Sequence, residues 1–330
     1  MNDTKLKYKS TVTRVGVILL IFVGFLSVFM SVYLTLPIDL LPEPAATIID
    51  SIVYDAAYLA AFMLPVAFVK LIFKPEERQP MRLEPRISWN VFAFICIGVA
   101  FTYAFSYINS MVVDLIFSVP VPEDMFNYAT PKMSNGEIIL EFITIALVPA
   151  FCEEFLFRGV VLSTLMPYGK STAVVISAVC FGLMHGNFYQ FLYTTVAGLI
   201  LGAVYVMTDS IWPGTIIHMI NNALSVLQMV MMENLTEEYA YILWIAVECL
   251  VFASGIISFV VIVRRYKHVE KEKTSVFGKP LAADLACRDA GFWGHSRLDA
   301  VDSVKAFFAP TIIAFIVYAL FEAFAMLAAL

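Results

Sequence analysis

The stretch EIILEFITIALVPAFCEEFLFR, residues 137–158, decides the fold of this chain. It is an apolar segment long enough to span a membrane, and it ends in a cluster of charged residues. A spanning helix needs about 20 mostly apolar residues, and 137–157 supplies them. The run ends in two adjacent carboxylates, Glu153 and Glu154, with Arg158 one turn further on. A charge near the centre of a bilayer costs about 2.5–3.5 kcal/mol on insertion scales, so these residues need partners, a cavity or a chemical role.

The composition of the whole chain is that of a membrane protein. Of its 330 residues, 61% are hydrophobic and 15% are charged, and the mean hydropathy is +0.83. A soluble domain has about 45–50% apolar and about 25% charged residues. No basic cluster indicates nucleic-acid binding, and the five cysteines show no metal-binding or redox spacing. We therefore expect an integral membrane protein that contacts the lipid bilayer and has no nucleic-acid partner.

The same length rule identifies nine apolar segments along the chain. The fifth is short for a span and contains Ser177 and Gly182. We predict an all-α fold, a polytopic bundle of eight to nine transmembrane helices. The nine segments are 15–36, 51–73, 89–112, 137–157, 172–185, 188–207, 211–231, 240–263 and 305–328.

Lysine and arginine residues near the ends of these segments orient them in the membrane. Basic residues occur in the N-terminal arm and in the stretches 70–86, 158–170 and 264–267, whereas 37–50, 113–136 and 233–238 are acidic. This alternation predicts a multi-pass protein with a cytoplasmic N-terminus. The location would be the plasma membrane if the protein is prokaryotic.

The charged cluster has two interpretations. Glu154 and Arg158 are four residues apart, so on a helix they share a face and can pair. Glu153 is rotated by about 100° from Glu154 and is left to face elsewhere. The same cluster also fits a helix end at the membrane surface, where the guanidinium reaches water and both carboxylates are solvated.

Two further clusters repeat the four-residue spacing inside apolar segments. Phe181 and His185 form the first, and His218 and Asn222 form the second. Each fits a structural role, as a helix cap or an interhelical hydrogen bond. The second also fits a chemical role, because an imidazole and an amide can both donate to a developing oxyanion. The chain has only four histidines, and two of them follow the acidic pair at intervals of about 30 residues.

In this order the patterns Glu-Glu-x-x-x-Arg, Phe-x-x-x-His and His-x-x-x-Asn resemble the CPBP family. That family includes the type II CAAX prenyl proteases and bacterial proteins tied to bacteriocin self-immunity and lysostaphin resistance. All three motifs are present without a substitution. The resemblance covers the expected catalytic core, 137–231. It is preceded by N-terminal helices in 1–136 and followed by C-terminal helices in 232–330, with a cytoplasmic linker near 268–303.

The resemblance implies an intramembrane endopeptidase that hydrolyses a peptide bond of a membrane-embedded or lipid-anchored peptide or protein. Glu153 would activate the attacking water with help from His185, and His218 and Asn222 would stabilise the tetrahedral oxyanion. The Glu-Arg pair would shape and neutralise the site. The implied site residues are Glu153, Glu154, Arg158, His185, His218 and Asn222.

Members of the family have also been interpreted as zinc-dependent, with Glu153, His185 and His218 as the ligands. One glutamate and two histidines are an accepted set for a catalytic zinc ion. The sequence does not choose between the glutamate and the zinc scheme, and we commit to no cofactor. Two other classes of function stay open. One is a catalytically silent membrane regulator or immunity protein of the same family, and the other is a proton-coupled transporter with Glu153, Glu154 and Glu248 as relay.

Overall fold

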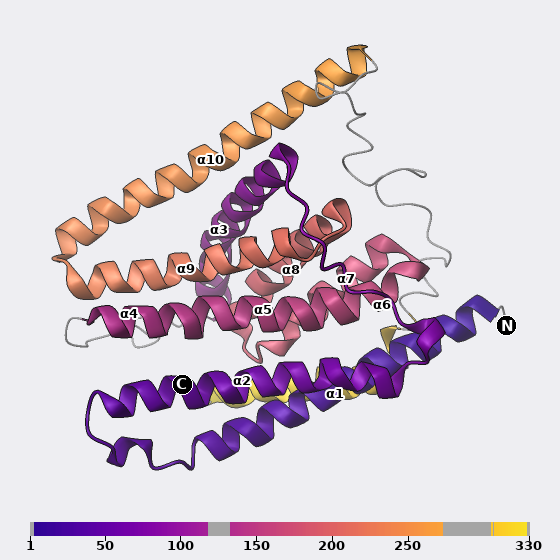
Figure 1. Ribbon diagram of the computed structural model, residues 1–330, viewed down its shortest axis with the longest axis horizontal. Helices are drawn as coiled ribbons and strands as arrows, with labels where there is room; N and C mark the ends of the chain where they lie inside the picture. The colour runs from indigo at the N-terminus through magenta and orange to yellow at the C-terminus, as the bar shows by residue number, and fades with distance from the viewer. Residues whose placement is uncertain (1–2, 118–132, 273–304, 306, 329–330) are drawn as a thin grey trace.

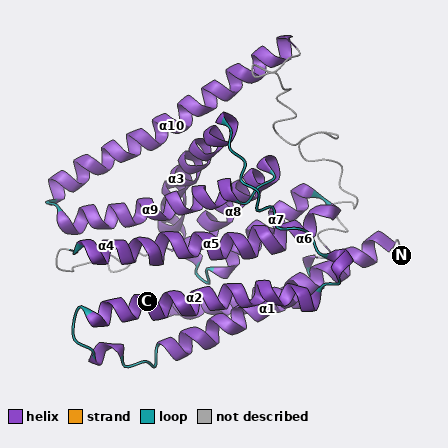
Figure 2. Cartoon of the chain, viewed as in Figure 1, coloured by secondary structure: helices purple, strands orange, loops and turns teal. Residues whose placement is uncertain are grey.

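The computed structural model describes residues 3–117, 133–272, 305 and 307–328. Among these residues every regular element is helical, as Figure 2 shows, and this confirms the predicted all-α membrane bundle. The elements are α1 (Asp3–Tyr33), η1 (Ile38–Leu40), α2 (Ala45–Ile72), η2 (Pro75–Glu77), α3 (Trp89–Phe117), α4 (Asn135–Glu141), η4 (Phe142–Leu147), α5 (Val148–Glu154), η5 (Phe155–Leu162), α6 (Ser163–Leu165), η6 (Met166–Tyr168), α7 (Lys170–Met184), α8 (Phe188–Thr208), α9 (Trp212–Asn234), α10 (Glu237–Glu272) and α13 (Pro310–Ala328).

Six of the described helices are long and apolar enough to cross a membrane: α1, α2, α3, α8, α9 and α10. α7 and α13 are shorter apolar helices, so the total of eight to nine spans stays a prediction. Several described helices extend beyond the apolar segments predicted for them. α1 begins at Asp3 rather than at residue 15, so the basic arm is the first part of that helix. α10 continues to Glu272 and so takes up the start of the predicted linker, while 273–303 lies outside the described residues.

The segment with the deciding motif is one rod, from α4 through α5 to α6, across the middle of the bundle (Figure 1). Two π-helical segments, η4 and η5, interrupt it. Pro149 has no N–H to donate to the carbonyl of Ile145 four residues back, and the side chain of Asn222 donates to that carbonyl at 2.9 Å. In η5 the Ser177 hydroxyl donates to the carbonyl of Phe157 at 2.9 Å. π-helical segments are frequent at functional sites.

Small residues let α7 and α8 pack closely. A Cβ atom added at Gly198 would lie 2.9 Å from the Cα of Ala178, and one added at Gly202 would lie 3.1 Å from a methyl group of Val174. Without a hydrophobic driving force between helices in lipid, such close backbone approach is a main source of packing energy. The two glycines therefore set the distance between α7 and α8, and with it the place of His185 at the end of α7.

The connection between α2 and α3 packs on the turn between α8 and α9. The N–H of Ile211 donates to the carbonyl of Arg82 at 2.9 Å, and the Arg82 side chain forms an ion pair with Asp209. At the same end of the bundle, Arg14 of α1 forms an ion pair with Glu77. These contacts bring the α1 N-terminal half, the α2–α3 connection and the α8–α9 turn together. Simple alternation of the helices assigns the same three segments to one side of the membrane.

We expect Gly198→Ala to destabilise the protein by about 1–3 kcal/mol, because the new methyl group would meet backbone rather than a flexible side chain. Thermal unfolding of the full chain in detergent measures the effect. Gly24→Ala in α1 is the matched control, because nothing lies within 4 Å of a Cβ atom at that position. The control should be neutral or slightly stabilising, since Ala favours a helix over Gly by up to about 1 kcal/mol. Equal behaviour of the two variants would contradict the packing described here.

Candidate active site

The predicted pairing of Glu154 with Arg158 is present, and it is buried. The Arg158 Nη1 donates to the Glu154 Oε1 at 2.6 Å, and Arg158 and Glu154 are 1% and 0% exposed, respectively. A second guanidinium nitrogen donates to the carbonyl of Gly198 in α8 at 3.2 Å. The guanidinium also lies over the ring of Phe181, 4.5 Å from its centroid. The alternative of a solvated helix end, with Arg158 in water, is wrong, because the pair lies in the interior of the bundle.

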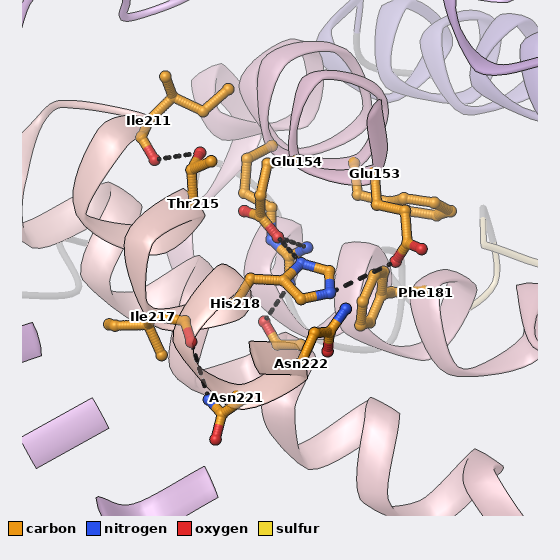
Figure 3. A network of polar contacts seen from close by, with 12 residues as sticks. Glu153, Glu154, Phe181, Ile211, Thr215, Ile217, His218, Asn221 and Asn222 are labelled. Carbon is orange, nitrogen blue, oxygen red and sulfur yellow. Dashed lines mark hydrogen bonds and ion pairs between the residues drawn. The ribbon is translucent and has the colours of Figure 1, made fainter. Parts of the chain in front are cut away.

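His218 of α9 joins this pair to Glu153 (Figure 3). Its Nδ1 lies 3.2 Å from the Glu154 Oε1, and because an ionised carboxylate can only accept, the Nδ1 carries the proton. Its Nε2 faces the Glu153 Oε2 across 3.8 Å. Glu154 therefore orients the imidazole so that its second nitrogen points toward the other carboxylate.

Glu153 has one oxygen in a hydrogen bond and one without. The hydroxyl of Tyr58 in α2 donates to the Oε1 at 2.5 Å. The Oε2 is buried and accepts no hydrogen bond from any residue that the structure describes. The residue is only 4% exposed, and a buried polar atom without a partner requires an explanation.

The motif Phe-x-x-x-His acts through both the backbone and the ring of Phe181. The His185 Nδ1 lies 2.9 Å from the carbonyl oxygen of Phe181, which can only accept, so the Nδ1 donates and the Nε2 is free. The Phe181 ring contacts His185 and His218 edge to face, with centroids 5.2 and 5.8 Å apart and interplanar angles of 80° and 88°. One aromatic side chain thus packs against both imidazoles and the guanidinium.

Asn222 and its neighbour Asn221 bring two amides to the same region of α9. The side chain of Asn222 donates one N–H to the carbonyl of Ile145. Its amide group has a second N–H that can donate to another acceptor. Asn221 donates to the carbonyl of Ile217 at 3.0 Å, and its Oδ1 is buried without a partner among the described residues.

Four of the six predicted site residues border one cavity of about 920 Å³: Glu153, His185, His218 and Asn222. Glu154 and Arg158 lie behind it and support His218. Sequence reasoning missed Tyr58 and Asn221, which also line the cavity. Tyr58 belongs to another helix, 95 residues from Glu153, and its only signal is a polar hydroxyl within an apolar segment.

The zinc scheme does not fit the arrangement of these side chains. Across the described ranges, no group of three or more His, Cys, Asp and Glu side chains is placed to hold a metal ion. Glu153, His185 and His218 border one cavity but do not form a ligand set there.

One protein-family model matches the middle of the chain. Residues 135–224 match the family model described as type II CAAX prenyl endopeptidase Rce1-like. No curated protein and no solved structure matches the chain. All six predicted site residues lie inside the matched range, so the resemblance seen in the sequence is confirmed over these residues. Because this is a protease family, the match supports endopeptidase activity within a multi-pass membrane protein.

We expect Glu154→Gln to destabilise the protein by about 3–5 kcal/mol, because it leaves the buried Arg158 guanidinium without its partner. The decrease in the thermal unfolding midpoint of the full chain in detergent measures this destabilisation. Glu77→Gln is the matched control at a half-exposed pair with Arg14, where about 0–1 kcal/mol is expected. The pKa of Glu77 is lowered, chiefly by a hydrogen bond from the backbone N–H of Lys74 at 3.0 Å. Glu77→Gln therefore also removes a full negative charge. Similar losses for both variants would contradict the burial of the Glu154 pair.

Proposed function

We propose, on the premise that residues 135–224 belong to the Rce1-like family of type II CAAX prenyl endopeptidases, that this chain is an intramembrane endopeptidase with a glutamate-activated water. Its substrate is a membrane-embedded or lipid-anchored peptide or protein. The observation that carries the proposal is the Glu153 Oε2. It is buried, accepts no hydrogen bond from a described residue, and belongs to a side chain that lines a cavity of about 920 Å³ beside two histidines.

A water molecule fits between Glu153 and His218. Their facing atoms are 3.8 Å apart, too far for a direct hydrogen bond, but both can reach one bridging water. In the proposed reaction Glu153 takes a proton from this water while the water oxygen attacks the peptide carbonyl carbon. The C–N bond then breaks, and Glu153 returns the proton to the departing amine. The products are a new carboxyl terminus and a new amino terminus.

Oxyanion stabilisation falls to His218 and Asn222 in this scheme. A protonated His218 donates from both nitrogens, to Glu154 through Nδ1 and into the cavity through Nε2. The second N–H of Asn222 is the other donor, and its first holds the side chain against Ile145. Donors fixed in place before the reaction stabilise developing charge most effectively.

His185 and Tyr58 complete the scheme from two sides of Glu153. The free Nε2 of His185 can accept from the water or from the substrate, which is the assisting role proposed for it. Tyr58 holds the Glu153 Oε1 and so directs the other oxygen toward the cavity. We assign Tyr58 as a positioning residue.

Glu153→Gln is expected to lower the cleavage rate by about 100-fold to 10,000-fold, because the amide cannot accept a proton. The assay uses the full chain in vesicles with fluorescence-quenched peptides on a single membrane anchor. The variant should keep the wild-type unfolding midpoint, unlike Glu154→Gln. The control is Glu76→Gln, an exposed position in η2 away from the cavity.

The same experiment separates the proposal from its two alternatives. Unchanged cleavage by Glu153→Gln would refute the role assigned to that carboxylate. A silent regulator predicts no cleavage by the wild type and an unchanged cellular phenotype for the variant. A transporter predicts that Glu153→Gln and Glu248→Gln alter proton-coupled flux across the vesicle membrane.

The proposed topology has a cytoplasmic N-terminus and can be tested with two matched exposed glutamates. Glu43 precedes α2 and Glu76 lies in η2, at opposite ends of that helix. In a chain whose native cysteines are replaced, a membrane-impermeant maleimide should label Glu43→Cys in intact cells. It should label Glu76→Cys only after lysis. The reverse pattern would overturn the orientation.

A further inference from the structure

The cavity extends toward one end of the bundle. Its lining includes Tyr33 at the end of α1, Asp50 near the start of α2, Tyr189 at the start of α8 and Trp244 near the start of α10. The α1–α2 connection and the α9–α10 turn lie at this end, on the left in Figure 1 and away from the N-terminus. The contact between Arg82 and Asp209 is at the other end. In the proposed orientation the cavity therefore faces the extracytoplasmic side.

Apart from two histidines, the ionisable acidic and basic side chains that line the cavity in the described part of the chain all have one sign. Among the described residues the lining includes three carboxylates, Asp50, Glu141 and Glu153, and no lysine or arginine. Seven tyrosines accompany them. Tyrosine rings attract cations through their π faces, most strongly where water is excluded. The lining is therefore suited to a positive charge and opposes a negative one.

Glu141 is the least compensated of these carboxylates. The charged groups that interact electrostatically with Glu141 are Glu233 of α9, Asp55 of α2 and Glu137 of α4, all acidic. Within the described residues Glu141 forms no ion pair, and the Asp55 Oδ1 and the Glu233 Oε2 are buried without hydrogen-bond partners. Repulsion among these groups would be relieved by a bound cation.

The buried Glu153 adds an independent observation deeper in the same cavity. It is 96% buried, since 4% is exposed, and its Oε2 has no hydrogen-bond partner among the described side chains. A ligand that follows the lining from Glu141 to Glu153 would pass from one carboxylate to the atoms proposed to react. An extended peptide has the shape for that path, and a small ion would fill only part of a cavity of about 920 Å³.

We propose that this cavity selects basic peptides, with a lysine or arginine side chain of the substrate held by Asp50 and Glu141 among the tyrosine rings. The inference rests on the proposed endopeptidase function and names its substrate class. Asp50 is already held by a hydrogen bond from Tyr33 at 2.8 Å, so one of the two carboxylates is fixed in place before the substrate arrives. Asp50 and Glu141 are specificity residues and take no part in the chemical step.

Binding of two matched peptides tests the proposal without requiring cleavage. The full chain is placed in nanodiscs of zwitterionic lipid, and fluorescence anisotropy follows two labelled peptides of equal length. One peptide carries four lysines, and the other has glutamine in their place. We expect tighter binding of the lysine peptide, and we expect the difference to shrink as salt is raised.

Variants at the two carboxylates locate the preference. Asp50→Asn and Glu141→Gln should each weaken lysine-peptide binding by about fivefold and leave the glutamine peptide unaffected. Glu76→Gln makes the same change in net charge at the opposite end of α2 and should change neither affinity. The peptide comparison and its salt dependence use the wild type, so they test the proposal even if a variant fails to fold.

Three results would overturn the inference. The first is equal affinity of the wild type for both peptides, and the second is a lysine preference that both variants retain in full. The third is displacement of the lysine peptide by millimolar Mg²⁺ or Ca²⁺ but not by NaCl of equal ionic strength, which would indicate a metal-ion site.

Cleavage in the same samples distinguishes this inference from the proposed function. Charge-dependent binding without cleavage of either peptide would contradict the endopeptidase and leave the basic-peptide site intact. Cleavage of both peptides at equal efficiency would contradict the specificity and leave the endopeptidase intact.

Discussion

The buried ion pair of Glu154 with Arg158 is the interaction on which the rest of the site depends. Neither charge is tolerable alone inside a membrane bundle, and each has donors or acceptors beyond the pair itself. The guanidinium reaches the carbonyl of Gly198 in α8, and the carboxylate reaches His218 in α9. The ion pair thereby fixes the position of the α5–η5 segment relative to α8 and α9. Gly214 allows the approach, because a Cβ atom there would lie 3.3 Å from the Glu154 Oε2.

The motif residues also satisfy backbone groups that a membrane interior cannot hydrate. Pro149 leaves the carbonyl of Ile145 without its helical donor, and Asn222 donates to it. His185 donates to the carbonyl of Phe181 at the end of α7. Since each unpaired polar group costs free energy in lipid, losing such a side chain would weaken the fold as well as the chemistry. A protein without proteolytic activity would therefore still have a structural reason to keep the three motifs.

Local spacing in the sequence predicted the helices of this site and the pairing within one helix, because both follow from a period of 3.6 residues. It could not place Tyr58 against Glu153, since that contact joins helices whose packing no local pattern encodes. The sequence also left two locations open for Arg158, the membrane surface and the interior of the bundle. Burial of that residue depends on α7, α8 and α9 closing around it. The π-helical segments were missed as well, although Pro149 within an apolar run was a usable signal.

Two adjacent glutamates end with different tasks because a helix turns by about 100° per residue. Glu154 faces a guanidinium and an imidazole, so its charge is compensated and its oxygen orients His218. Glu153 faces a tyrosine hydroxyl and a cavity, so one of its oxygens is held and the other is left for a ligand. The same side chain is structural in one position and chemically available in the next. What separates the two is the set of side chains that each one faces. Arg158 of η5 and His218 of α9 compensate the charge of Glu154, whereas Tyr58 of α2 only orients Glu153.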